Sequence, residues 1–418
     1  MARSITIAGS HADNALFKEF YGNYDGEALI NSSTPGSSLI MRNKKVDFVG
    51  DLFRQPVRFG SAVGVGFRAA GANLPGPVTA PRGVALFQSK RGYATAEFDR
   101  EAIKASRNDK GAFAKVTVDD VNAAEEGFSL HMVERPLFSD GSGKLGEVGT
   151  VDSGAGTTAS PWVLTMTTTG TNAPKHKKRV YPQGAQLDFY SALGVLQLTA
   201  EVVSATSTTL IVKLVAAASA VVPQANDICY WEGNKDGETV GLSQFAPVSA
   251  GTLYGISQTN NPQFRGSIRS ITGTLDFGDI NGIIADLEEE IQSPKVGITS
   301  HKAMKLLKDQ AEDQKRYNAS EIKSANGKVG FKGIEVMTSE GAIPLIASQF
   351  CPDDEMYFLD PKYMMYVMRE DFGWFDDDGS ILMRDPNKDS YNARFGGYFE
   401  LFCSKPNTVG RVKGFTVS

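Results

Sequence analysis

The sequence contains few of the residues that build metal and redox sites. Its 418 residues include only three cysteines and four histidines. Cys229, Cys351 and Cys403 lie far apart and form no CxxC pair, and no two histidines have HExxH spacing. These absences argue against a structural zinc site and a redox motif, so we expect no metal and no cofactor. We expect the three thiols to stay reduced, as in cytosolic proteins.

Long apolar runs and an excess of positive charge are also missing. No window contains the roughly 18 apolar residues of a membrane helix, and Lys213 interrupts the apolar run from Leu210 to Val222. The first residues are not followed by the apolar segment of a signal peptide. The net charge is −5, whereas a protein whose main task is to grip nucleic acid is usually basic. We therefore expect a cytoplasmic protein without a membrane contact.

Motifs typical of catalysis occur only in fragments. The triplet Asp371–Gly373 is found in kinases, but no HRD segment accompanies it. The acidic run Asp376–Ser380 has its glycine at the wrong position for a calcium loop, and Asp140–Gly143 lacks the Lys-Ser/Thr of a P-loop. No GxSxG elbow is present. We interpret these segments as structural turns and predict that the protein is not an enzyme.

The N-terminal part of the chain predicts extended segments with little core of their own. Residues 1–56 contain many turn formers and predict an arm. A period of two predicts a strand, with apolar residues at Val57, Phe59, Val63, Val65 and Phe67. A loop rich in Pro and Gly leads from it to a second strand-like stretch at 84–98. Residues 57–98 thus predict a long hairpin, which is marginally stable alone and should lie on another domain or chain.

The remainder predicts helices and a β-rich insertion. A helix is expected from Asp119 to Pro136, because Thr117 and Asp120 have capping-box spacing and proline ends helices. Residues 251–418 predict an α+β part, with helices around 280–291 and 300–311. Residues 149–250 predict a small barrel or sandwich. Its five expected strands are Trp162–Thr168, Gln186–Tyr190, Leu196–Ser204, Thr208–Val215 and Asp227–Glu232.

Three groups of charged residues are candidates for contacts with other molecules. Two groups have opposite signs and can set the register between neighbouring chains. The basic group in the hairpin is Arg58, Arg68, Lys90 and Arg91, and the acidic group on a predicted helix is Glu288, Glu289 and Glu290. A third, basic group can contact DNA or a neighbour, or form a solvated turn. It comprises Lys175, Lys177, Lys178 and Arg179.

Four stretches, in their order along the chain, resemble those of the tailed-bacteriophage major capsid protein of the Hong Kong 97-type fold. They are Tyr93–Ser106 with Gly111–Phe113, Asp140–Gly146, Asn261–Gly266 and Lys405–Arg411. None of these stretches is specific alone, and the resemblance lies in their order. It implies an α+β fold with these parts: an N-terminal arm (1–56), an E-loop hairpin (57–98), a P-domain with a spine helix (99–148), an inserted small β-barrel or sandwich (149–250), and an A-domain with strands returning to the P-domain (251–418).

The resemblance also implies a structural role. Members of this family assemble into hexamers and pentamers of an icosahedral shell around double-stranded DNA. The implied location is the virion capsid, with assembly in the bacterial host cytoplasm. The implied partners are further copies of the chain, a portal, a separate scaffolding protein and DNA held by weak contacts. A decoration or cement protein is a further partner that the resemblance allows.

Two other functions remain open at this point. An encapsulin-type nanocompartment has the same fold but encloses cargo protein instead of DNA. A β-rich carbohydrate-binding protein or enzyme would use Trp162 or Trp231 as an exposed platform, although such residues are more often buried.

Overall fold

The chain forms two compact units in the computed structural model. The first unit comprises Met1–Val46, Ser89–Arg135 and Tyr366–Glu400, and the second comprises Asp47–Gln88, Pro136–Met365 and Leu401–Ser418. The structure describes residues 36–43, 52–60, 64–76, 78–99, 121–167, 178–215, 221–290, 293–317, 334–338, 341–376, 381, 383–384 and 388–417. Most of the predicted arm, the start of the helix predicted from Asp119, and most of the acidic run after Asp376 lie outside these residues.

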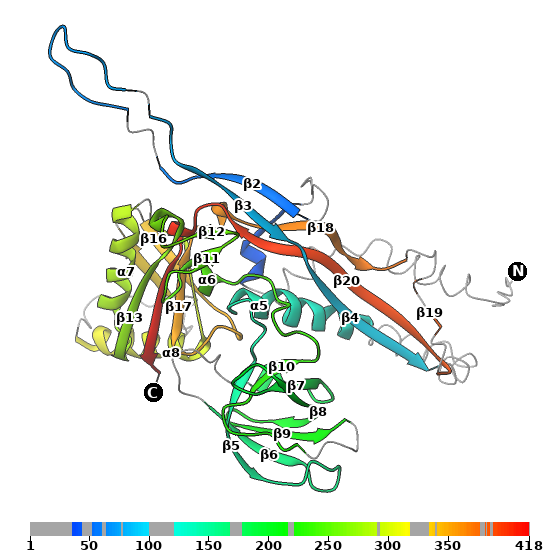
Figure 1. Cartoon of the computed structure of the whole chain (residues 1–418). Coiled ribbons are helices and arrows are strands. Elements are labelled where there is room, and N and C mark those ends of the chain that lie inside the picture. The colour runs from blue at the N-terminus through cyan, green and yellow to red at the C-terminus, as the bar shows by residue number, and fades with distance from the viewer. Residues whose placement is uncertain are drawn as a thin grey trace, which may run out of the picture. The chain divides into compact units, whose positions relative to one another are not determined.

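The first unit is built on a sheet of long strands (Figure 1). β18 (Met364–Trp374) and β20 (Ser390–Cys403) lie in the middle of the order β1-β18-β20-β19. β4 (Lys90–Asp99) pairs antiparallel with β20, from Lys90 opposite Phe399 to Asp99 opposite Ser390. The short strands are β1 (Met41–Asn43) and β19 (Met383–Arg384).

A helix with a π turn belongs to the first unit for most of its length. Residues 121–128 are α-helical, Ser129–Glu134 form the π-helix η3, and Arg135–Leu137 form α5. The buried ring of Phe128 contacts three rings of the sheet edge-on, those of Phe372, Phe395 and Phe399. Pro136 was predicted to end the helix, but the helix ends at Leu137. The wider π turn shifts the hydrogen-bond register just before a residue that has no N–H to donate.

The second unit contains a six-stranded mixed sheet with two helices on one face. α7 (Phe277–Glu290) and α8 (His301–Tyr317) share an apolar core with the sheet, including Ile283, Leu307 and Phe358. The helices predicted around 280–291 and 300–311 are therefore confirmed as α7 and α8. In spatial order the strands are β13 (Ser267–Thr274), β21 (Gly410–Thr416), β17 (Glu355–Leu359), β14 (Val296–Thr299), β16 (Gly341–Ala347) and β15 (Ile334–Thr338).

The predicted β insertion is a closed barrel of six strands, filled by its own side chains. Leu164, Phe189 and Val202 are among its fully buried residues. Five strands were predicted, and β5 was missed because burial alternates only over its first residues and its end is polar and exposed. Around the barrel the strands are β10 (Ile228–Trp231), β5 (Gly146–Ser153), β6 (Trp162–Met166), β9 (Thr209–Leu214), β8 (Leu196–Ala205) and β7 (Gln186–Tyr190).

A two-stranded hairpin completes the second unit, but it differs from the predicted one. β2 (Leu52–Arg58) pairs with β3 (Arg82–Gln88), and the ladder ends at Arg58 opposite Arg82. Beyond Arg58 the Phe59 N–H still donates to the carbonyl of Pro81 at 3.0 Å, but the described residues of the expected strand from Val57 to Phe67 form no further strand. Frequent glycines there offer no side chains to pack. Residues after Ser89 form β4 and pair with β20 instead of extending the hairpin.

Short elements connect these parts. They are η1 (Ser37–Leu39), η4 (Lys178–Val180), α6 (Leu242–Phe245), β11 (Thr252–Leu253), β12 (Ile256–Ser257), η5 (Pro262–Phe264), η6 (Pro361–Tyr363) and η7 (Pro406–Thr408). None of the helices that the structure describes is long and apolar enough to cross a membrane.

The packed barrel generates a stability prediction. We expect Leu164→Ala to lower the free energy of unfolding by about 2–5 kcal/mol, because it removes buried methyl groups and leaves a cavity. Leu193→Ala is the matched control, since Leu193 lies in the same barrel but is 92% exposed. Urea denaturation of both variants measures the difference. Equal losses would contradict a barrel held together by its interior.

Candidate functional site

The inner face of the β2–β3 hairpin is fixed by an aromatic cluster within the second unit. Phe53 on β2 and Phe87 on β3 lie opposite each other, with ring centroids 4.8 Å apart. Both rings contact Phe402, and Phe87 also contacts Tyr254 at 5.0 Å. The Tyr254 hydroxyl donates to the carbonyl oxygen of Leu401 at 2.7 Å, and the Leu86 N–H donates to the carbonyl of Tyr254 at 2.9 Å. The base of the hairpin is therefore held with one face inward.

The outer face of the hairpin is exposed and carries arginines among apolar side chains. Because side chains alternate along a strand, the residues between the buried ones point away from the aromatic cluster. They include Arg54 and Arg58 on β2, and Arg82, Val84 and Leu86 on β3. The three arginines are exposed, and none of them has an ion-pair or hydrogen-bond partner among the described residues. This face offers positive charge and apolar area, which is chemistry for binding a partner.

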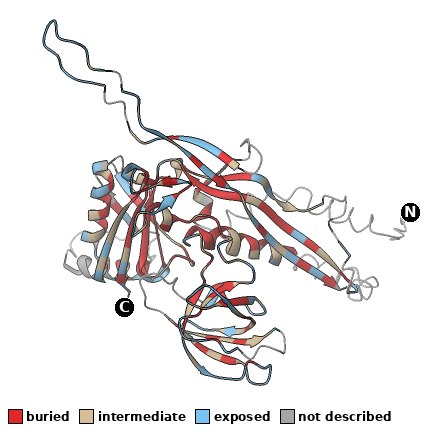
Figure 2. Cartoon of the chain, in the orientation of Figure 1, coloured by how far each residue is buried: buried red, intermediate tan, exposed pale blue. Residues whose placement is uncertain are grey.

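The segment beyond the paired strands exposes large apolar side chains. Figure 2 shows the described part of this tip as almost wholly exposed. Val65 is 79% exposed, Leu74 is 87% exposed, and Phe67 has no burial at all. Arg68, one of the predicted contact residues, is also exposed here. Such a run of uncovered apolar residues is unusual for a monomer and marks a binding surface.

The structure separates the predicted contact residues into different places. Arg58 and Arg68 belong to the hairpin, whereas Lys90 and Arg91 lie on β4 in the first unit. The guanidinium carbon of Arg91 lies 5.7 Å from the centre of the Tyr398 ring. Sequence reasoning missed Arg82, which the strand register places opposite Arg58, and Arg54, which lies on the same face of β2.

The predicted acidic residues lie at the C-terminal end of α7. The Glu288 carboxylate accepts a hydrogen bond from the Ser293 hydroxyl at 2.6 Å. Glu289 is exposed and has no partner among the described residues. Glu290 is the last residue of the helix, and its side chain lies outside the described part.

The predicted basic run is described only at its end. Lys175 and Lys177 lie outside the described residues, and Lys178 is exposed in η4. The Arg179 guanidinium donates a hydrogen bond to the side-chain oxygen of Gln349, so part of this run contacts its own chain. Whether the run binds DNA stays a prediction.

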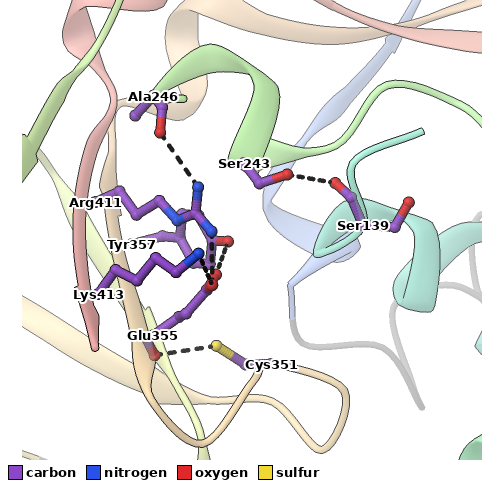
Figure 3. Close-up of polar contacts among 8 residues, drawn as sticks. All are labelled: Ser139, Ser243, Ala246, Cys351, Glu355, Tyr357, Arg411 and Lys413. Atoms are coloured by element: carbon purple, nitrogen blue, oxygen red, sulfur yellow. Dashed lines mark hydrogen bonds and ion pairs between the residues drawn. The ribbon is translucent and has the colours of Figure 1, made fainter. Parts of the chain in front are cut away.

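A buried polar network joins β17 and β21 (Figure 3). Its side chains alternate with Met356, Phe358 and Val412, which share the core with α7 and α8, so the network lies on the opposite face of the sheet. Arg411 on β21 and Glu355 on β17 are 6% and 7% exposed, and their Nη2 and Oε1 atoms are 2.6 Å apart. The Tyr357 hydroxyl donates to Oε2 of Glu355, and Lys413 Nζ lies 4.0 Å from Oε1. Burial, followed by the negative charge of Glu355, raises the pKa of Tyr357 well above its ordinary value. The hydroxyl is therefore a permanent donor to the carboxylate.

A second buried carboxylate fastens the base of the barrel. Glu238 accepts hydrogen bonds from the Ser139 hydroxyl at 2.9 Å and the Asn234 amide at 2.7 Å. The chain enters the barrel after Ser139 and leaves it before Glu238, so this side chain joins the two connecting segments. The N–H of Asp236 donates to the carbonyl of Ser142 at 2.8 Å across the same joint. The barrel is thus bound to its unit by polar contacts on both connections.

The helix of the first unit carries two buried glutamates with different surroundings. Glu134 accepts from the N–H groups of Gly36 and Ser37 at 3.0 and 2.7 Å, and so anchors the start of η1. Glu125 accepts only from the indole N–H of Trp374 at 2.8 Å, and its Oε2 has no partner among the described residues. Burial raises the pKa of Glu125 above its ordinary value.

Among the described residues, no group of three or more His, Cys, Asp or Glu side chains is placed to hold a metal ion.

The ion pair under the sheet generates a second prediction. We expect Glu355→Ala to lower the free energy of unfolding by about 3–5 kcal/mol, because Arg411 is left as a buried charge without its carboxylate. Glu201→Ala removes an ion pair with Lys213 that is about one-third exposed, so we expect a loss below about 1 kcal/mol. Urea denaturation compares the two, and similar losses would show that burial of the pair is unimportant.

Glu125 generates a pH prediction. The folded state binds its proton more tightly than the unfolded chain, whose glutamate titrates near the ordinary pKa of 4.5. The free energy of unfolding is therefore expected to fall as pH rises above 4.5 and to level off above the raised pKa. Glu125→Gln should lose this part of the pH dependence and gain relative stability at neutral pH. Urea denaturation over this pH range tests it, and identical pH profiles would contradict it.

The chain resembles known proteins in its fold and not in its sequence. Neither protein-family models nor curated protein sequences match the chain. Among solved structures, the capsid asymmetric unit of cyanophage A-1(L) has a TM-score of 0.51 at 12% identity, over 92% of this chain and 93% of that one. The capsid of a native GTA particle has a TM-score of 0.44 at 10% identity, over 94% and 91% of the two chains. The structure described as Mycobacterium phage Bobi has a TM-score of 0.42 at 10% identity, over 97% and 99%.

The likeness to the cyanophage structure extends over nearly the whole of both chains, so it is not limited to one shared motif. At this level of identity it establishes the fold alone. The fold expected from the sequence resemblance is thereby confirmed: the chain has the Hong Kong 97-type fold of tailed-phage capsid proteins, with a closed six-stranded barrel inserted after its long helix.

Proposed function

We propose that the chain is the major capsid protein of a tailed bacteriophage, and that its copies form the hexamers and pentamers of an icosahedral shell around double-stranded DNA. The carrying observation is the β2–β3 hairpin, which exposes arginines and large apolar residues that its own chain does not cover. The shared fold with a cyanophage capsid structure supports the same conclusion.

Assembly explains why the sequence keeps a hairpin that is poorly stabilised in an isolated chain. A two-stranded ribbon is marginally stable in water, and the tip buries almost no apolar area in its own unit. Docking on another copy would remove that area from water. Each copy in a closed shell makes several such contacts, so individually modest contacts multiply once a subunit is held by its neighbours.

The barrel does not favour the carbohydrate-binding alternative. Trp162 is 2% exposed and packs inside the barrel, so it offers no platform to a sugar ring. The indole N–H of Trp231 donates to the carbonyl of Val180 at 3.2 Å, which holds this ring against its own module. We propose that the barrel is a structural addition to the shell subunit.

The proposed partners follow from the proposed role. They are further copies of the chain, a portal, a separate scaffolding protein and DNA held by weak contacts. The proposed location is the virion capsid, with assembly in the host cytoplasm. An encapsulin-type compartment would instead copurify with a cargo protein and without DNA, which the composition of purified particles distinguishes.

Assembly is tested directly by microscopy of the full chain, expressed alone and with a lysate of the producing host. We expect closed, uniform particles by negative stain. Phe67→Ser with Leu74→Ser should reduce particle formation strongly, because the tip loses apolar area that assembly buries. Phe67→Tyr with Leu74→Met keeps most of that area and is expected to assemble. A chain that stays monomeric under all conditions would refute the proposed function.

A further inference from the structure

The hairpin carries an isolated excess of positive charge. Residues 52–88 contain four arginines and no lysine, aspartate or glutamate. The whole chain has a net charge of −5, so the rest of the chain carries −9. The charge that would complement the hairpin is therefore present elsewhere on the same kind of chain, and a second copy can supply it.

Two of these arginines oppose each other across the strands. Arg58 and Arg82 are register partners in the antiparallel ladder, and both are exposed. Like charges directly opposite each other destabilise a strand pair. No acidic group offsets them, because neither arginine has a partner among the described residues. Arg54 lies on the same face of β2, about 13 Å along the strand.

α7 shows the opposite imbalance. Its 14 residues contain five acidic side chains and no lysine or arginine. Three of the acidic residues, Glu288, Glu289 and Glu290, end the helix, where the helix dipole is negative and favours basic side chains. Asp286 is paired with Arg269 at 3.6 Å, but Glu289 is exposed and has no partner among the described residues. Glu288 accepts a hydrogen bond from Ser293, so Glu289 is the exposed carboxylate at this end of α7 that a second copy can pair.

The opposed arginines of the hairpin and the acidic C-terminal end of α7 both lower local stability. The hairpin has positive charge without acidic residues, and α7 has negative charge without basic ones. A contact between copies would place guanidinium groups beside carboxylates and the negative end of a helix dipole. Val84 and Leu86, which are 51% and 40% exposed, flank the arginines and would be covered in the same contact. Local conflicts of this kind are expected where a sequence serves a function at the cost of stability.

We propose, resting on the proposed function, that the outer face of the β2–β3 hairpin docks on the C-terminal half of α7 of a second copy. Arg58 and Arg82 face Glu288 and Glu289 of that copy in this contact. The contact sets which neighbour a subunit accepts, because the charges of α7 would repel an acidic surface and those of the hairpin would repel a basic one.

Charge reversal on each side tests the pairing. Arg58→Glu with Arg82→Glu should raise the protein concentration needed for particle formation at least about tenfold, and Glu288→Lys with Glu289→Lys should do the same. The four changes together should restore assembly to near the wild-type threshold. Light scattering and negative-stain microscopy of the full chain measure the threshold. If the variant with all four changes does not regain the wild-type assembly threshold, the pairing is overturned.

Two controls separate docking from folding and from net charge. Arg58→Gln with Arg82→Gln removes the repulsion across the strands, so the subunit should melt no lower than wild type while the assembly threshold rises. Lys305→Glu with Lys308→Glu changes the net charge by the same amount as Arg58→Glu with Arg82→Glu, but on α8, where neither lysine has a partner among the described residues. This control should assemble normally. Unchanged assembly of both arginine variants would overturn the inference.

The remaining outcomes assign failure to one proposal or the other. Wild-type particles together with normally assembling reversal variants would overturn the docking and leave the shell function standing. A wild-type chain that never assembles would refute the shell function itself. If the arginine variants assemble normally but lose binding of a short DNA duplex in a fluorescence anisotropy titration, the hairpin face binds nucleic acid, and the docking is overturned.

Discussion

The aromatic contact of Phe53 and Phe87 with Tyr254 and Phe402 determines what the hairpin can do. These rings come from three distant parts of the chain and bury one face of a ribbon that is at best marginally stable alone. With the inner face fixed, strand alternation leaves the arginines with no direction but outward. The aromatic cluster thus converts a weak secondary-structure element into a surface of defined composition and orientation within its unit.

Buried carboxylates join separate segments of the chain at three places. Glu355 joins neighbouring strands through Arg411, Glu238 joins the two connections of the barrel, and Glu134 holds the first backbone amides of η1. Each of them accepts at least two hydrogen bonds or a salt bridge, which offsets the cost of removing a charge from water. Glu125 accepts one hydrogen bond among the described residues, which offsets burial only in part, so its pKa is raised and its neutral form is favoured.

Local patterns in the sequence predicted the elements whose stability is local. The helix around 280–291 and five strands of the barrel follow from periods of 3.6 and 2, and both were found. β5 was not predicted, because the second half of this strand is polar and exposed and shows no alternation of apolar and polar residues. The register of the hairpin was not predicted either, because it depends on which residues contact Tyr254 and Phe402. The pairing of Arg58 with Arg82 could therefore not be predicted from the sequence. Glu355 and Arg411 are 56 residues apart, and no local signal links them.

The barrel begins and ends at one point of the fold. Gly146 at the start of β5 is the register partner of Cys229 on β10, and the Leu145 N–H donates to the Cys229 carbonyl at 2.9 Å. Because its two ends are adjacent, the barrel joins the rest of the chain at a single point, as a tight turn would. Evolution can therefore gain, lose or exchange such a cassette in one genetic event without rebuilding the sheet beside it. The same geometry makes residues 146–229 a place where another domain with adjacent termini would fit.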